Sequence, residues 1–126
     1  MEIEALTPML RTWDLSATIE FYTAVLGFAC DSRSEAWASL RRDHIGIMLS
    51  GPNHHGGDQA PAFTGSLYFR TDNVDEFWLA VKDRARICYS IETFSYGMRE
   101  FGIYDNNGYL LQFGQPAPAK GYRTGP

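Results

Sequence analysis

The chain has 126 residues, of which 44% are hydrophobic and 14% aromatic, and its formal net charge is −4. This length suits one domain with a buried core, whereas the short apolar runs exclude a membrane-spanning helix. The acidic balance and the lack of a Lys/Arg block argue against a nucleic-acid partner and favour a neutral or cationic ligand. Because no basic segment precedes an apolar stretch at the N-terminus, we expect a cytoplasmic protein.

The first predicted element after a short N-terminal strand is an amphipathic helix within LRTWDLSATIEFYTAVLGF. Its apolar residues recur at steps of three or four and are Leu15, Ile19, Tyr22 and Leu26. Asp14 is the expected N-cap, and Gly27 is expected to end the helix.

Three strands are predicted after this helix, in FACDS, AWASLRR and HIGIMLS. A hairpin loop at Arg42-Asp43 between the last two strands would place Trp37 opposite Met48.

The same order of elements is predicted again further along the chain. FRTDNV follows LRTWDL at an offset of 59 residues and opens a second helix. The apolar stripe of that helix is Val74, Phe77, Trp78, Val81 and Ala85. Asn73 is the expected N-cap, with Glu76 three residues later.

Three further strands are predicted in ARICYSI, MREFGIYD and YLLQFG. Asn107-Gly108 indicates a hairpin turn before the last of them. A loop of Asn106-Asn107, or of the four residues 105–108, would place Phe101 opposite Gln112.

The chain is therefore predicted to be one domain, residues 1–126, made of two βαβββ modules at about 5–50 and 65–116. A Gly- and Pro-rich linker loop, 51–64, joins them, and a tail, 117–126, follows. Within the linker, His54 and His55 are adjacent and precede Asp58. We interpret them as residues of a surface loop, able to close as a lid, rather than as metal ligands.

One face of the predicted strands combines aromatic and polar side chains. By the period-two alternation of strands, it comprises Thr7, Trp37, Ser39, Met48, Ser66, Tyr68, Arg99, Phe101, Ile103 and Gln112. Gln112 is informative because an amide within an apolar strand needs a hydrogen-bond partner. The aromatic residues could instead fill the core, and Arg99 could pair with a neighbouring carboxylate.

A resemblance to a known family lies in the duplicated unit and in three motifs, MLRTWDLSATIEFYTAVLGF, GSLYFRTDNVDEFW and YGMREFGIYDNNGYLLQF. In these features the chain resembles the vicinal oxygen chelate superfamily, the glyoxalase, bleomycin-resistance and dioxygenase group. The resemblance spans about residues 5–116. It implies an α+β fold in which two βαβββ modules form a cup-shaped curled mixed sheet, and usually a homodimer. The metal-ligand positions of the family correspond here to Thr7, Met48, Ser66 and Gln112.

Those four residues supply neither a charge nor an imidazole, so we predict no metal and no other cofactor. The resemblance is nearest to the metal-free bleomycin-resistance branch, whose members sequester a drug. We therefore predict a small-molecule-binding protein, not an enzyme, with no catalytic residues. Its predicted ligand-binding residues are Trp37, Ser39, Met48, Ser66, Tyr68, Arg99, Phe101 and Gln112.

Two alternatives remain open at this point. One is a lyase, isomerase or dioxygenase that holds a metal through unusual ligands, or that uses Arg99 and Tyr68 for acid–base catalysis. The other is a ligand-sensing or protein-binding module.

Overall fold

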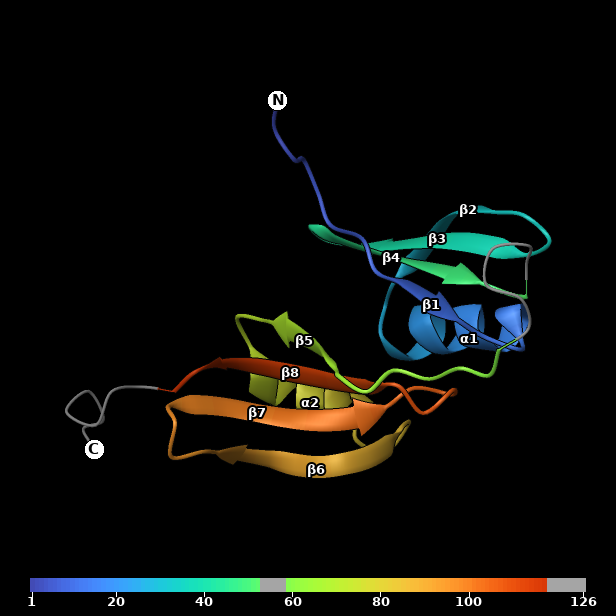
Figure 1. Cartoon of the computed structure of the whole chain (residues 1–126). Coiled ribbons are helices and arrows are strands. Elements are labelled where there is room, and N and C mark those ends of the chain that lie inside the picture. The colour runs from blue at the N-terminus through green and yellow to red at the C-terminus, as the bar shows by residue number, and fades with distance from the viewer. Residues whose placement is uncertain (53–58, 118–126) are drawn as a thin grey trace. The chain divides into compact units, whose positions relative to one another are not determined.

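The computed structural model describes residues 1–52 and 59–117, which contain two four-stranded sheets (Figure 1). His54, His55 and Asp58, and residues 118–126 of the expected tail, lie outside the described residues. The chain forms two compact units. Unit 1 is Met1–Phe63 with Asn106–Gly108, and unit 2 is Thr64–Asp105 with the residues from Tyr109 onward. The α+β fold of two tandem βαβββ modules is confirmed, whereas the single-domain organisation remains a prediction.

Unit 1 contains one sheet with strand order β1-β4-β3-β2, in which β1 is parallel to β4 and the other pairs are antiparallel. Its elements in chain order are β1 (Met9–Arg11), α1 (Leu15–Glu20), the π-helical segment η1 (Phe21–Val25), β2 (Ala29–Arg33), β3 (Trp37–Arg42) and β4 (Ile45–Ser50).

The expected ends of the first helix are confirmed. The carboxylate of Asp14 accepts a hydrogen bond of 3.0 Å from the backbone N–H of Ala17. Gly27 adopts φ +76°, which ends the helix in a conformation that glycine tolerates best.

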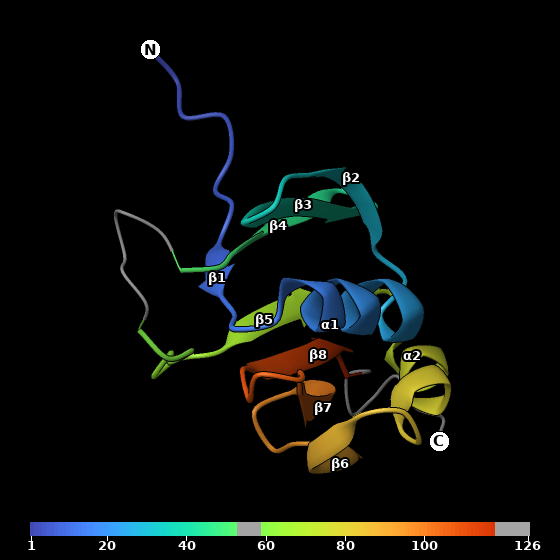
Figure 2. The same ribbon diagram turned by 90° about the vertical axis from the view of Figure 1, so that its right-hand side faces the viewer.

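The core of unit 1 lies between its helix and one face of its sheet (Figure 2). Its buried apolar residues are Leu10, Tyr22, Leu26, Phe28, Ala38, Leu40, Ile47 and Leu49. In β3 and β4 these buried residues alternate with half-buried ones, as expected for a sheet with one covered face.

The hairpin of unit 1 turns one residue later than predicted. Arg42 is opposite Ile45, so the two-residue loop is Asp43-His44, and Asp43 adopts φ 51°. Trp37 is therefore opposite Ser50, not Met48. Because the register differs by two residues, the side chains keep their predicted faces.

Unit 2 repeats this arrangement, with strand order β5-β8-β7-β6 and β5 parallel to β8. Its elements in chain order are β5 (Leu67–Arg70), α2 (Val74–Val81), β6 (Arg86–Thr93), β7 (Met98–Tyr104) and β8 (Leu110–Pro116). Neither α1 nor α2, in the described part of the chain, has the length and apolar character needed to cross a membrane.

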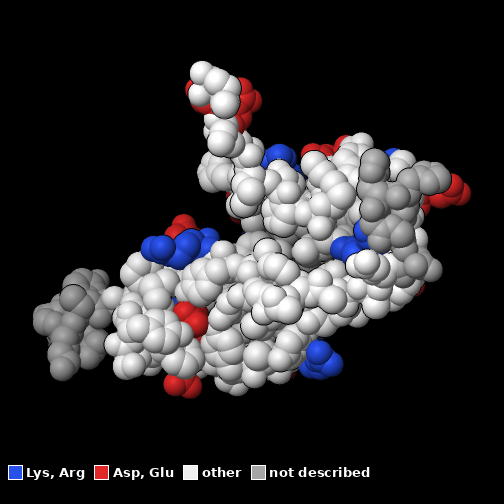
Figure 3. Space-filling view, in the orientation of Figure 1, with Lys and Arg blue, Asp and Glu red and all other residues white. Residues whose placement is uncertain are grey.

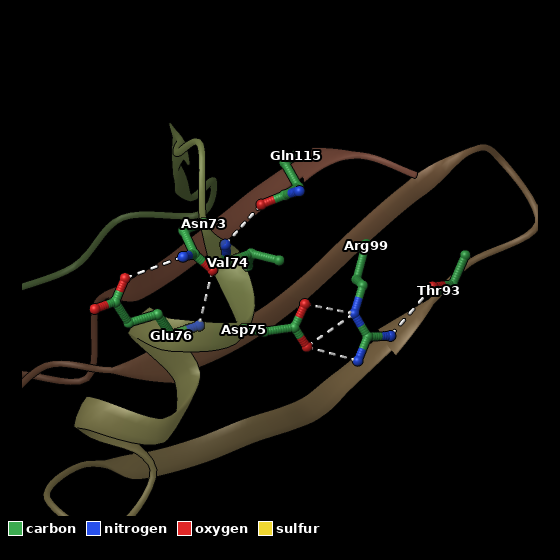
Figure 4. A network of polar contacts seen from close by, with 7 residues as sticks. All are labelled: Asn73, Val74, Asp75, Glu76, Thr93, Arg99 and Gln115. Carbon is green, nitrogen blue, oxygen red and sulfur yellow. Dashed lines mark hydrogen bonds and ion pairs between the residues drawn. The ribbon is translucent and has the colours of Figure 1, made fainter. Parts of the chain in front are cut away.

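Helix α2 begins at the predicted N-cap, Asn73, which bonds to Glu76 through its side chain. The side chain of Asn73 accepts a hydrogen bond from the N–H of Glu76 at 3.2 Å and donates one to its carboxylate at 3.0 Å. The amide oxygen of Gln115, in β8, accepts a hydrogen bond from the N–H of Val74 at 2.6 Å (Figure 4). The start of the helix is thereby tied to its own sheet.

The predicted register between β7 and β8 is wrong by one residue. Phe101 is opposite Phe113, and Gly102 is opposite Gln112. The backbone N–H of Asp105 donates to the carbonyl of Tyr109, which leaves three residues, 106–108, in the loop. Gly108 adopts φ +88°, the left-handed conformation that ends a three-residue hairpin loop.

A one-residue shift moves every side chain of a strand to the other face, so two predicted ligand-binding residues in β7 are misplaced. Phe101 is 0% exposed and packs against Trp78 of α2, with ring centroids 5.1 Å apart. Arg99 forms an ion pair with Asp75 of α2 at 2.8 Å and a hydrogen bond to Thr93 (Figure 4). Both residues therefore face the helix rather than the open side of the sheet.

Candidate functional site

The side of the unit 2 sheet opposite α2 carries two rows of residues that run across the four strands. In the order β5-β8-β7-β6, the first row is Tyr68, Gln112, Gly102 and Tyr89. The second row is Arg70, Gly114, Glu100 and Glu92. We call these eight residues, together with Ser66 and Tyr96, the tyrosine face.

Glu100 is the centre of the tyrosine face. Its carboxylate accepts hydrogen bonds from the hydroxyls of Tyr68 at 2.7 Å, Tyr89 at 2.6 Å and Tyr96 at 2.8 Å. Tyr68 bonds to one oxygen, and Tyr89 and Tyr96 share the other. Glu100 itself is only 3% exposed, so three phenols enclose a buried carboxylate.

Gln112 extends this network across β8. Its amide N–H donates to the hydroxyl of Tyr89 at 3.0 Å, and its amide oxygen accepts from the hydroxyl of Ser66 at 2.5 Å. The partners that the sequence required for this amide are therefore side chains of the same face.

Two glycines make room for the tyrosine rings. A Cβ atom at Gly102 would lie 2.9 Å from Cδ1 of Tyr89 and closer still to Cε1. A Cβ atom at Gly114 would lie 3.0 Å from Cζ of Tyr68 and closer still to its hydroxyl. Without side chains at these positions, the two rings can cross neighbouring strands and reach Glu100.

The hydrogen bonds keep Glu100 ionised and the phenols neutral. Burial raises the pKa of Glu100, but the three hydroxyl donors outweigh it, so the pKa lies below its ordinary value of 4.5. Burial and the bond to Glu100 together raise the pKa of Tyr68 to about 12. The pKa of Tyr89 and that of Tyr96 are raised by the same two causes.

These shifts predict that stability declines at both ends of the pH range. The lowered pKa of Glu100 stabilises the folded state above about pH 4.5, and this contribution is lost as pH falls through the folded-state pKa. The raised pKa of Tyr68 stabilises the folded state below pH 10.0, and that contribution is lost as pH rises to about 12.

Denaturant unfolding of the wild type, Glu100→Gln and Tyr68→Phe across this pH range checks the prediction. The advantage of the wild type over Glu100→Gln should shrink below pH 4.5. Its advantage over Tyr68→Phe should shrink above pH 10.0. Advantages that do not change with pH would contradict the proposed linkage.

The corresponding side of the unit 1 sheet is more apolar. Ser39 is opposite Met48, which in turn pairs with Met9 of β1, and Trp37 lies on the same face. Trp37, Ser39 and Met48 are half-buried, and Met9 is exposed. The sequence places the first three on one face, as the structure does, and their role in ligand binding remains a prediction.

The positions that correspond to the metal ligands of the family do not suit a divalent ion. In unit 2 the hydroxyl of Ser66 donates to the amide oxygen of Gln112, so these two groups satisfy each other. In unit 1 the positions are Thr7 and Met48, which offer a hydroxyl and a thioether. Elsewhere in residues 1–52 and 59–117, no three His, Cys, Asp or Glu side chains are grouped so as to hold a metal ion.

Sequence reasoning missed the residues at the centre of the tyrosine face, Tyr89, Tyr96 and Glu100. A signal for Glu100 was present, because Phe101 and Ile103 alternate with Glu100 and Gly102. That alternation favours the apolar pair as the core side of β7. The prediction from the hairpin turn instead placed Phe101 opposite Gln112 and so gave the wrong face.

A model of the glyoxalase/bleomycin resistance protein/dioxygenase superfamily matches residues 5–113. The chain belongs to this superfamily. The match runs from before β1 into β8 and confirms the family that the sequence motifs resemble. Among curated proteins, none matches this chain.

Solved structures of superfamily members share its fold. A glyoxalase/bleomycin resistance protein/dioxygenase from Nocardioides has a TM-score of 0.77 at 16% identity, over 100% of this chain and 91% of its own. A bleomycin-binding protein complexed with bleomycin has a TM-score of 0.71 at 26% identity, over 90% and 98%. A bleomycin resistance determinant encoded on the transposon Tn5 has a TM-score of 0.72 at 26% identity, over the same shares.

Proposed function

We propose that this superfamily member is a metal-independent small-molecule-binding protein of the bleomycin-resistance type. It sequesters a flat, cationic or neutral ligand stoichiometrically in an aromatic-lined cup of a dimer. The observation that carries this proposal is the tyrosine face, where Tyr68, Tyr89 and Gln112 form a hydrogen-bonded surface. Fixed aromatic and polar groups of this kind hold and orient small ligands.

Two further observations support binding rather than metal-dependent catalysis. Ser66 and Gln112 bond to each other at positions where metal-dependent relatives are expected to hold an ion. The structural neighbours at 26% identity are described as a bleomycin-binding protein and a bleomycin resistance determinant.

The proposed ligand contacts combine predicted residues with residues that the structure adds. Those kept from the sequence are Trp37, Ser39, Met48, Ser66, Tyr68 and Gln112. Tyr89, Tyr96 and Glu100 are added because they complete the tyrosine face. Arg99 and Phe101 are left out because they pack against α2.

Titration with metal-free bleomycin, followed by tryptophan fluorescence and calorimetry, tests the proposal. We expect saturable binding that EDTA leaves unchanged, with the ligand recovered intact by mass spectrometry. Trp37→Phe should remove most of the fluorescence change, whereas Trp13→Phe, at an exposed position outside the β-strands, should not.

The same preparation tests the enzymatic alternative. The protein is incubated with Zn²⁺, Ni²⁺, Mn²⁺ or Fe²⁺, desalted and analysed for metal content. About one retained ion per chain that is lost in Gln112→Ala would overturn the proposal and direct the search to lyase, isomerase or dioxygenase substrates. The absence of any saturable ligand would also overturn it.

The proposal includes a homodimer in the cytoplasm that binds neither nucleic acid nor membranes. In Figure 3, the Lys and Arg side chains of the described residues lie in several separate small groups on the visible face. Nucleic-acid-binding proteins instead gather such residues in a patch or stripe. Sedimentation equilibrium of the full chain checks the dimer, and a monomer at all concentrations would contradict it.

A further inference from the structure

The charge of Glu100 has no cationic partner within the described residues. The ion pairs of this part of the chain join other residues, and the hydrogen bonds to Glu100 come only from the three neutral phenols. The three hydroxyl donors keep this carboxylate ionised but add no positive charge, so its negative charge is not neutralised. The tyrosine face therefore holds a negative charge that a bound cation would compensate.

The tyrosines around this charge leave an aromatic surface open to solvent. Tyr68 is 42% exposed and Tyr96 is 65% exposed, while their hydroxyls are engaged with Glu100. Because these hydroxyls are bonded to Glu100, a ligand would contact Tyr68 and Tyr96 mainly through their rings. The faces of aromatic rings attract cations through their electron density.

The aromatic surface is held in place by packing. Tyr96 stacks on Phe94 with ring centroids 5.4 Å apart and 5° between the planes. Tyr89 meets the same Phe94 edge-on at 5.6 Å and lies across Gly102. Side chains fixed in this way lose little freedom on binding, so a ligand need not order them.

Two charged residues beside Glu100 have opposite effects on a bound cation: Glu92 attracts it and Arg70 repels it. Glu92 is exposed and directly opposite Glu100 on the neighbouring strand, where two like charges repel each other. Arg70 lies on the same face and acts on Tyr68 by its positive charge. A bound cation would relieve the repulsion between the carboxylates and would itself be repelled by Arg70.

We propose that the tyrosine face recognises the ammonium group of an organic cation, held over the rings of Tyr68 and Tyr96 by the buried charge of Glu100. This assignment rests on the proposed function and specifies the chemical class of its ligand. Cation–π contact with aromatic rings is a means by which proteins recognise quaternary ammonium groups, and the negative charge of Glu100 adds attraction for the cation.

A pair of isosteric probes tests the proposal on the full chain. Choline carries a quaternary ammonium group, and 3,3-dimethyl-1-butanol has the same shape without the charge. In a titration followed by NMR, choline should bind about tenfold more tightly than the alcohol. Glu100→Gln should abolish this preference, and Arg70→Gln should strengthen choline binding.

Matched variants separate recognition from folding. Glu92→Gln also removes one negative charge, but at an exposed position, and should weaken choline binding less than Glu100→Gln does. If Glu100→Gln fails to fold, Tyr96→Leu removes an exposed ring and should still lower the affinity. Equal binding of choline and the alcohol, or unchanged affinity in both Glu100→Gln and Tyr96→Leu, would overturn the proposal.

Titration with bleomycin distinguishes failure of the ammonium site from failure of the proposed function. Bleomycin binding without any preference for choline would overturn only the ammonium site. A preference for choline without bleomycin binding would support the ammonium site and count against a bleomycin-resistance function. No binding of bleomycin, choline or the alcohol would overturn both.

Discussion

Replacing Phe101 with alanine is expected to lower the free energy of unfolding by about 3–5 kcal/mol. The ring is 0% exposed and lies among Phe77, Trp78 and Phe113, with centroid distances of 6.3, 5.1 and 5.2 Å. Its removal would leave a cavity between α2 and the sheet of unit 2, which the neighbouring rings can fill only in part. Denaturant unfolding followed by circular dichroism measures the loss.

Phe63→Ala is the matched control, because Phe63 is 51% exposed and its removal should change stability by no more than about 0.5 kcal/mol. If Phe101→Ala is unfolded at the start of the titration, Phe101→Leu should show a smaller, measurable loss. A ligand-facing Phe101 would behave differently: the alanine variant would keep its stability and lose ligand affinity. That result would contradict the register of β7.

Replacing Gly102 with alanine is expected to cost about 1–3 kcal/mol, because the new Cβ would overlap the ring of Tyr89. The ring cannot move aside without losing the bonds of its hydroxyl to Glu100 and Gln112. The variant should therefore lose part of the tyrosine face as well as stability. The unfolding midpoint measures the stability, and a spectroscopic titration of the phenols measures the pKa shift of Tyr89.

Gly114→Ala gives a matched comparison on the neighbouring strand. Its Cβ would lie 3.0 Å from Cβ of Glu100, and its main clash would be with the far end of the Tyr68 side chain. Tyr68 is 42% exposed and can swing into solvent, with loss of its one bond to Glu100. We therefore expect a smaller loss of stability than in Gly102→Ala. A larger loss in Gly114→Ala would show that Tyr68, and not Tyr89, is the more tightly held ring.

Both helices, their N-caps and the end of the first helix could be predicted because their signals are local. The end of the second helix was missed, because Ala85 was assigned to its apolar stripe whereas α2 ends at Val81. The spacing of Tyr22 and Leu26, the caps at Asp14 and Asn73, and the stop at Gly27 each depend on residues within a few positions. The structure confirms all of them. The duplication was also visible, because both copies present the same motifs at a fixed offset.

The candidate site was predicted only in part, because its membership depends on strand register. Ser66, Tyr68 and Gln112 were placed on one face by the period-two alternation of strands, and the structure places them together on the open face. Phe101 was misplaced because the Asn107-Gly108 signal is compatible with loops of two, three or four residues. A local turn signal cannot choose among them.

The sequence by itself determined the order of helices and strands, the two βαβββ modules and the superfamily, since periodic patterns and short motifs carry that information. For β7 the apolar alternation and the turn signal favoured opposite faces, and only the tertiary structure decided between them. Packing of Phe101 against Trp78 of α2 and burial of Ile103 fix the register, and the turn amides of Asn106 and Asn107 bond to Thr18, far away in the chain. These long-range contacts have no local signature, and they bring Glu100 among three tyrosines from two strands and a loop.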